Sequence, residues 1–334
     1  MTQLVSILIP AYNAERWLGD TIESALAQTW PNKEVIVVDD GSSDHTFKVA
    51  RSFAARGVRV LSQSNAGASA ARNAALRESQ GAYIQFLDAD DLLHPDKIRL
   101  QLQHADDGHR ASVLLTSAWG RFFVRPDHAT FSPGPLWDDL SPLDWLITKF
   151  SQNQFMLPAS WLVSRRIARR AGPWNETLSL DDDGEYMCRL VAASRRVRFV
   201  GESKCYYRIG NASSLSSQKT ERALRSQFWS LKLCIDHLLT LESSERTRHA
   251  CVRLLQDNLQ HFEPQWPELA GRCRELAHAL GGELITPGER IHFRVYRSLF
   301  GWQAANALRS RVNRLRLQLR RTVDRLPQFH SHAN

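Results

Sequence analysis

The chain has 334 residues, of which 43% are hydrophobic and 23% charged, a balance typical of a globular protein and unlike that of a disordered one. No apolar run reaches the length of about 18 residues that is expected of a membrane-spanning helix. The first residues also lack the basic region and the small-residue cleavage site of a signal peptide, so we expect a cytoplasmic location. The net charge of +8 arises within residues 288–326, which hold ten Arg and two acidic residues. Because the remainder is balanced, nucleic acid is not expected as a partner.

Short apolar strands alternate with amphipathic helices through the first hundred residues. Strands are predicted at 4–10, 34–40, 58–62 and 82–87, and helices at 14–28, 45–55 and 68–79. This order predicts an α/β fold of Rossmann-like type, with a mostly parallel sheet covered by helices on both faces.

The pattern changes in the second part of the chain. A strand pair around Gly120 is predicted within 111–124, a strand entering a helix at 157–167, a helix at 182–194, and strands at 196–200 and 204–209. From about Ser216 the pattern is helical, with breaks near Leu241, Glu263-Pro264, Gly281-Gly282 and Pro287-Gly288. A boundary near Ser216 therefore divides a domain of residues 1–216 from an α-helical C-terminal region of residues 217–334. The five scattered cysteines are expected to be buried thiols, because they are odd in number and form no CxxC motif.

Unusual polar loops follow each of the first four predicted strands. They read "PAYN", "DDGSSD", "SNAGASAARN" and "DADD", and the carboxyl ends of parallel strands place them at one edge of the sheet, where ligands bind. The first loop contains neither G-x-G-x-x-G nor a Walker A sequence, which argues against a dinucleotide or P-loop site. Pro10 and Tyr12 instead suggest a rigid turn that presents an aromatic ring for stacking on a nucleobase. Asp40 is suited to accept hydrogen bonds from a base edge, and Arg72 to contact phosphate or base.

The fourth loop brings three carboxylates together, those of Asp88, Asp90 and Asp91. Crowded carboxylates repel each other and resist burial unless a cation compensates them. Mg²⁺ is usually held by one or two carboxylates together with substrate phosphates, so Asp88 and Asp90 are predicted to address a ribose and a metal ion. The alternative is that these acids only cap the helix that begins near Pro95.

Residues 4–216 resemble family 2 glycosyltransferases of the GT-A fold. The resemblance rests on the segments "SILIPAYN", "VIVVDDGSSD", "SNAGASAARN" and "YIQFLDADDLLHPDK", and less densely on "SRRIARRAGPWNETLSLDDDGEYMCRL" and "YYRIGNASSLS". It implies an inverting transferase that uses an NDP-sugar, with UDP as the expected nucleotide, in the synthesis of cell-surface polysaccharide, glycan or glycolipid. It also implies a nucleotide-binding half at 1–100, an acceptor and catalytic half at 101–216, and Mn²⁺ or Mg²⁺ held by Asp88 and Asp90. The positions that match the family's nucleotide-sugar contacts are Pro10, Tyr12, Asp40, Asn65, Arg72 and Asp88.

The resemblance further implies a catalytic base in an acidic pair before a helix, which places Asp183 in the base position and leaves Asp182 as the alternative. An ionised carboxylate there would take the proton of an acceptor hydroxyl as it attacks the anomeric carbon. Arg208 and Ser213 in the closing segment are either diphosphate contacts or parts of a surface loop. Trp161 and Trp174 are either an acceptor platform or, as is more common for tryptophan, core residues.

A basic amphipathic helix is predicted at about 303–326. One face of this helix is apolar, and arginines cover the remaining face. The apolar face carries six residues, which are Leu308, Val312, Leu315, Leu319, Val323 and Leu326. This helix either packs on its own domain or on a second copy of the chain, which is the favoured interpretation, or lies on the inner face of an anionic membrane.

The expected partners are thus an NDP-sugar donor and a glycan or lipid-linked acceptor. Two other functions stay open: a non-catalytic nucleotide-sugar-binding module that acts through its helical tail, and a sugar nucleotidyltransferase. The second is disfavoured because the first loop lacks a Gly-rich, basic sequence.

Overall fold

The main sheet has five strands, in a computed structural model that describes residues 2–105, 112–210 and 220–286. Its order is β3-β2-β1-β4-β8. The strands are β1 (Val5–Ala11), β2 (Lys33–Asp39), β3 (Val58–Ser62), β4 (Tyr83–Phe86) and β8 (Val163–Ser164). The first four are parallel, as predicted, and β8 pairs antiparallel to β4. Every residue of β1 is buried, as expected for a central strand covered on both faces.

Helices connect the parallel strands and cover the sheet. They are α1 (Leu18–Leu26), α2 (Thr46–Ser52) and α3 (Ala68–Glu78), with a short 3₁₀ turn η1 (Ala54–Arg56) after α2. Helix α3 packs on β1 and β2, whereas α1 packs against α2 and a short strand, β5 (Leu92–Leu93). The predicted alternation of strand and helix is confirmed, although α1 is shorter than the predicted 14–28.

A second sheet has the order β5-β9-β6-β7, with β6 (Val113–Phe122), β7 (Thr130–Phe131) and β9 (Arg196–Arg208). The prediction of a strand pair around Gly120 is wrong, because β6 runs through that glycine as one strand. Gly120 is needed there for a different reason: a Cβ atom would lie 2.8 Å from the ring of Phe131 on β7. The strands predicted at 196–200 and 204–209 are also one strand, since β9 follows β6 in parallel and absorbs a register shift at Ser117/Ala118.

The connections of the second half are mostly helical. They are α4 (Lys97–Gln103), η3 (Pro126–His128), α5 (Pro142–Ser151), η4 (Pro158–Ser160), α6 (Arg165–Ala171) and α7 (Asp182–Ala193). The predicted strand-to-helix passage at 157–167 is present as β8 followed by α6. The helix predicted at 182–194 is α7.

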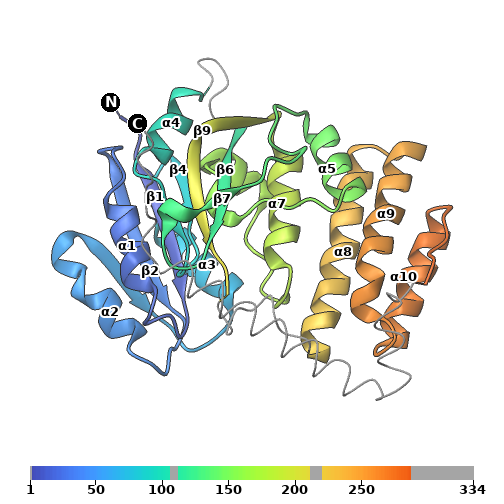
Figure 1. The fold of residues 1–334 in the computed structure, drawn as a ribbon, viewed down its shortest axis with the longest axis horizontal. Helices are drawn as coiled ribbons and strands as arrows, with labels where there is room; N and C mark the ends of the chain where they lie inside the picture. Colours follow the sequence, from blue (N-terminus) through green and yellow to red (C-terminus); the bar gives the residue numbers. More distant parts are fainter. Residues whose placement is uncertain (1, 106–111, 211–219, 287–334) are drawn as a thin grey trace, which may run out of the picture.

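Three further helices follow in a row beyond α7: α8 (Glu221–Leu241), α9 (Glu245–Phe262) and α10 (Pro267–Ala279), seen together in Figure 1. Helix α8 packs along α7, and α9 packs on α5 and α8. The predicted breaks near Leu241, Glu263-Pro264 and Gly281-Gly282 coincide with the ends of these helices. Within the described part of the chain no helix is long and apolar enough to cross a membrane.

Several predictions concern residues outside the described ranges. They are the boundary near Ser216, the break at Pro287-Gly288, the amphipathic helix at 303–326 and the role of Ser213.

Buried apolar residues of α8, α9 and α10 belong to the same core cluster as those of the main sheet. All five cysteines are buried free thiols, as expected.

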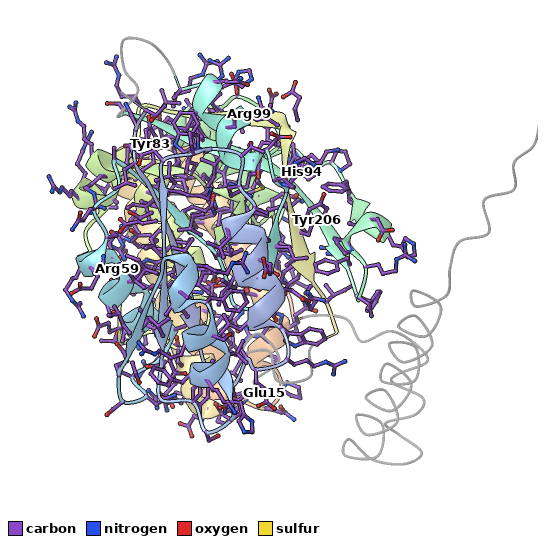
Figure 2. All side chains as sticks on the ribbon, turned by 90° about the vertical axis from the view of Figure 1, so that its left-hand side faces the viewer. Glu15, Arg59, Tyr83, His94, Arg99 and Tyr206 are labelled. Carbon is purple, nitrogen blue, oxygen red and sulfur yellow. The ribbon has the colours of Figure 1, made fainter. Side chains whose placement is uncertain are left out.

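The parallel strands place all four polar loops at one end of the sheet. In Figure 2, Tyr83 at the start of β4 and Glu15 in the loop after β1 lie at opposite ends of the molecule. The candidate site is at the end marked by Glu15, where β1, β2, β3 and β4 finish.

Candidate active site

The loops after β1 and β2 are tied together by side chains. Asn13, at a φ of 48°, accepts a hydrogen bond from the backbone N–H of Ser43 at 2.8 Å and donates its own backbone N–H to Ser42 Oγ at 3.0 Å. The backbone N–H of Glu15 donates to the carboxylate of Asp44 at 3.1 Å. These bonds hold the "PAYN" and "DDGSSD" segments in one shape. Tyr12 stays outside this network and is 51% exposed, so its ring is available to a ligand.

Asp40 connects the loop after β2 to the loop after β3. Its carboxylate accepts hydrogen bonds from Gln63 Nε2 at 2.7 Å, from the N–H of Ala66 at 2.9 Å and from the N–H of Gly67 at 2.8 Å. A carboxylate offers about four acceptor positions, so three of them hold the loop. The contact of Asp40 with a nucleobase stays a prediction. Its observed role, which is to fix the loop after β3, could not be predicted from the sequence.

The two other nucleotide-contact candidates of these loops lie nearby. Pro10 is buried as the next-to-last residue of β1, and Asn65 is exposed in the loop after β3. Gly41 permits the approach of the two loops, because a Cβ atom there would lie 2.7 Å from the backbone nitrogen of Asn65 and its φ is +70°.

Arg72 joins the fourth loop to the acidic segment before α7. Its guanidinium bonds Asp88 Oδ1 at 2.8 Å and Asp182 Oδ2 at 2.9 Å, and it lies 4.4 Å from the ring centroid of Trp174. Ser69 Oγ, one turn earlier on α3, donates to the same oxygen of Asp182 at 2.8 Å. Burial of Arg72 alone would lower its pKa, but the charges of Asp88 and Asp182 outweigh burial and keep the pKa above its usual value.

Asp91 points into the fold, away from its neighbours in the "DADD" loop. One carboxyl oxygen accepts the backbone N–H of Arg208 at 3.0 Å, and burial raises the pKa of Asp91 well above its usual value. The guanidinium of Arg208 donates to the backbone carbonyl of Asp90 at 2.9 Å and stacks between the rings of Trp17 and Phe122. Arg208 is therefore a buried brace for the loop and not part of a surface loop, while its contact with a diphosphate stays a prediction.

Asp88 and Asp90 are the partly exposed carboxylates of this loop. In residues 2–105, 112–210 and 220–286, no group of three or more His, Cys, Asp or Glu side chains is placed to hold a metal ion. Two carboxylates are nevertheless the usual protein share for Mg²⁺, whose remaining ligands are water and substrate phosphate. The donor set thus fits the predicted cation, and metal binding at Asp88 and Asp90 stays a prediction.

The three acids before α7 differ in their partners. Asp181, in the left-handed region at a φ of 59°, accepts a hydrogen bond from Ser230 Oγ of α8 at 2.7 Å. Asp182 is bound by Arg72 and Ser69 as described above. Asp183 accepts only the adjacent N–H of Gly184, at 2.9 Å, from the described residues. Of the two candidate bases, Asp183 is thus the one whose carboxylate is not held by an arginine.

The surroundings of Asp183 favour its protonated form. Burial contributes most, followed by the negative charges of Asp182 and Asp181, and together they raise the pKa of Asp183 to about 7. Arg72 acts in the opposite direction and is outweighed. A carboxyl group whose pKa lies near neutral pH is well matched to accept a proton during catalysis.

The two tryptophans considered as an acceptor platform are core residues. Trp161 is 0% and Trp174 is 2% exposed. Trp174 stacks on Tyr186 at a centroid distance of 4.1 Å. The core interpretation is confirmed, and neither ring can meet a sugar at the surface.

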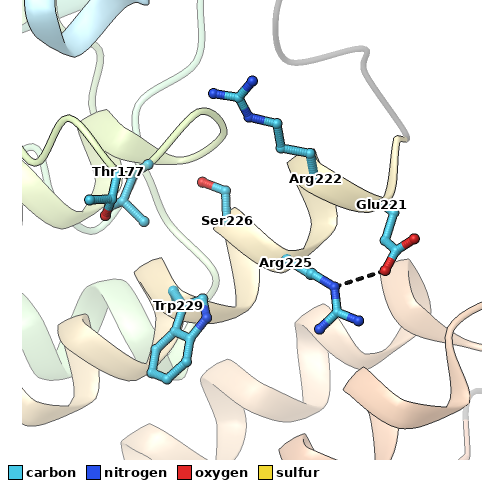
Figure 3. A pocket seen from close by; sticks show the side chains of 7 residues that line it. Thr177, Glu221, Arg222, Arg225, Ser226 and Trp229 are labelled. Atoms are coloured by element: carbon cyan, nitrogen blue, oxygen red, sulfur yellow. Dashed lines mark hydrogen bonds and ion pairs between the residues drawn. The ribbon is translucent and has the colours of Figure 1, made fainter.

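A hollow of about 720 Å³ lies beside α8, outside the group of predicted residues. Figure 3 shows Thr177 on a loop facing Arg222, Ser226 and Trp229 of the helix, and the ion pair of Arg225 with Glu221. Ser226 Oγ also accepts the backbone N–H groups of Ser179 and Leu180. The helix α8 thereby supports the loop that leads to the three acids.

Sequence reasoning missed the supporting residues Ser69 and Ser230. Ser69 lies three positions before Arg72, so helical spacing could have placed both on one face. Ser230 carries no local signal, because it reaches the site through the tertiary packing of α8.

The fold is of the GT-A class that is found in glycosyltransferases. TarS residues 1–349 from S. aureus, solved in complex with UDP-GlcNAc, match with a TM-score of 0.64 at 18% identity, over 82% of this chain and 81% of that one. A mannosyltransferase from Pyrobaculum calidifontis, in complex with GDP-Man and Mn²⁺, matches with a TM-score of 0.52 at 16% identity, over 97% and 87% of the two chains. At these identities the likeness concerns the fold.

Sequence comparison agrees with this fold. Residues 6–167, just under half of the chain, match the model of glycosyl transferase family 2, so this part of the chain is similar to that family. An uncharacterized glycosyltransferase of Rickettsia typhi is 27% identical over 235 residues, which cover 68% of this chain and 70% of the relative. Three further curated glycosyltransferases are matched over 18%, 33% and 44% of their own length.

Proposed function

We propose that this chain transfers a sugar from a UDP-sugar to an acceptor hydroxyl, with inversion at the anomeric carbon. The observation that carries the proposal is Asp183, a carboxyl group with a pKa raised to about 7 that the arginine of the site leaves unpaired. Inversion requires the acceptor oxygen to attack from the side opposite the diphosphate, while a carboxylate takes its proton. An α-linked donor then gives a β-linked product.

The four loops supply the donor site in this proposal. Tyr12 stacks on the base, Asp40 and Asn65 lie along the nucleoside, and Arg72 holds Asp88 in place for the sugar-nucleotide. Asp88 and Asp90 would hold Mn²⁺ or Mg²⁺, which when bound offsets the negative charge of the leaving diphosphate. The UDP-GlcNAc complex of TarS and the GDP-Man and Mn²⁺ complex of the archaeal enzyme support a nucleotide-sugar and a cation as ligands.

The setting of the reaction is part of the same proposal. We expect a glycan or lipid-linked acceptor in the synthesis of a cell-surface polysaccharide, glycan or glycolipid. The cytoplasmic location, and the contact of residues 303–326 with a membrane or with a second copy of the chain, stay predictions.

Donor binding is tested by thermal unfolding of the full chain with UDP-GlcNAc, UDP-Glc, UDP-Gal, GDP-Man or UDP, with and without Mn²⁺. A ligand that binds only the folded state at about 100 times its Kd adds about 2.7 kcal/mol of stability. A UDP-linked sugar is expected to give the largest rise in Tm, and Mn²⁺ is expected to increase it. Equal Tm values with and without every nucleotide would contradict the proposal. Binding without any turnover would favour the non-catalytic alternative.

The activity is expected to depend on pH through Asp183. Below about pH 7 this residue is increasingly protonated and cannot accept the hydroxyl proton, so kcat/KM for the donor should fall about tenfold per pH unit, and it should level off above pH 7. The measurement is the rate of nucleotide release between about pH 5 and 8. A flat profile over that range would exclude a base with such a pKa.

A further inference from the structure

Three aromatic side chains from separate segments meet beside the acidic loops. Trp119 of β6 lies 5.1 Å from Phe155, in the segment between α5 and η4, and 6.3 Å from Tyr207 of β9, measured between ring centroids. The guanidinium of Arg121 lies 4.9 Å from the centroid of Trp119. We call Trp119, Phe155 and Tyr207 the aromatic wall.

The aromatic wall adjoins the candidate active site through β9. Tyr207 directly precedes Arg208, which braces the loop of Asp90 and Asp91. The pKa of Tyr207 is raised to about 12, first by burial and then by the charges of the acids in the "DADD" loop and of Asp183. Among these acids, Asp90 and Asp91 are contacted directly by Arg208, the next residue of β9.

Part of the aromatic wall is exposed to solvent. Phe155 is 47% exposed, and Trp119 lies beneath it at 8%. An exposed phenylalanine leaves apolar surface in water, and burying such surface contributes about 25 cal/mol per Å² of stabilisation. A ligand that covered Phe155 would gain this free energy on binding.

A pyranose ring suits this surface. Its axial C–H groups form an apolar face that can pack on the negative face of an aromatic ring, while its hydroxyls point outward to polar groups. Arg121 is exposed at the edge of the wall and offers guanidinium donors at that position.

We propose that the aromatic wall binds the apolar face of a sugar ring at the acceptor end, so that the acceptor of this chain is a carbohydrate. This inference rests on the proposed function, because it requires that Asp183 serves the acceptor hydroxyl. Phe155 covers one face of the acceptor ring, and Arg121 bonds its hydroxyls.

The test compares Phe155→Ala, Phe155→Trp and the unchanged chain for sugar binding in the presence of UDP. Methyl β-D-glucoside, methyl β-D-galactoside and methyl N-acetyl-β-D-glucosaminide serve as probes, and saturation-transfer NMR gives their Kd. Phe155→Ala should weaken the best probe about tenfold, which corresponds to about 1.4 kcal/mol and is within the range of one aromatic contact. Phe155→Trp should retain the binding.

Phe47→Ala is the matched control, because Phe47 is 41% exposed on α2 and should not affect the probes. Tm values of all variants check that they are folded. Equal binding of the probes by the unchanged chain and Phe155→Ala, whether measurable or absent in both, would overturn the inference. Failure of the unchanged chain to bind UDP in the same samples would instead overturn the proposed function.

Discussion

Asp183→Asn is expected to lower the rate of sugar transfer by about 10²–10⁴-fold, the usual contribution of a positioned general base. The same change is expected to raise Tm above about pH 7. The pKa of Asp183 is raised to about 7 in the folded protein, whereas an unfolded Asp titrates near 3.9. As pH rises between these values the unfolded chain ionises first, so Asp183 makes the folded state progressively less stable. The side-chain amide of asparagine does not ionise, so the variant avoids this loss of stability.

Two measurements on one variant therefore separate a catalytic role from a structural one. A structural acid would lose stability and activity together when it is neutralised. The gain in Tm of Asp183→Asn should be absent near pH 4, grow between about pH 4 and 7, and be complete above. Asp138→Asn, at an exposed site, should change neither quantity.

Asp182→Asn distinguishes the two candidate bases. Asp182 is paired with Arg72 at 2.9 Å, so its neutralisation should lower Tm. If Asp182→Asn abolished transfer at unchanged Tm while Asp183→Asn remained active, Asp182 would be the base.

The part of the fold that follows from local patterns could be predicted from the sequence. Each parallel strand is a short, largely apolar run, and each is followed by a loop that is rich in polar residues. The sequence thus indicates which residues gather at the end of the sheet. The errors arose at Gly120 and at residues 201–203, where a glycine or an irregularity that resembles a turn lies inside a long strand. Only the facing ring of Phe131 and the shifted pairing with β6 explain these positions.

The interactions that differentiate the acids could not be predicted. Asp88 and Asp182 are 94 residues apart in the sequence, and only the packing of α3 against the segment before α7 brings both to Arg72. The same holds for the aromatic residues: Trp161 and Phe155 look equally suited to a binding surface, yet one is enclosed and the other exposed. Tertiary packing decides both cases, and it arises only when the layers of the fold are assembled.

Arg72→Met is expected to destabilise the folded chain by about 3–5 kcal/mol at neutral pH, because it leaves two carboxylates in a largely buried place without their counter-charge. The side chain of Arg72 is 7% exposed, and those of Asp88 and Asp182 are 30% and 12% exposed. Methionine keeps most of the length and the packing against Trp174, so the effect reports mainly the lost charge. Urea denaturation followed by circular dichroism measures it, and the loss should shrink below about pH 4, where carboxylates become protonated.

Arg77→Met is the matched control, since Arg77 is exposed on the same helix and should change stability by about 0.5 kcal/mol or less. The double variant Arg72→Met/Asp182→Asn gives the coupling between the two groups. If the bridge has the structure described, the double variant should be about 1–3 kcal/mol more stable than the sum of the single losses predicts. Additive losses would mean that Arg72 and Asp182 act independently. In that case the absence of an arginine partner would no longer set Asp183 apart as the base.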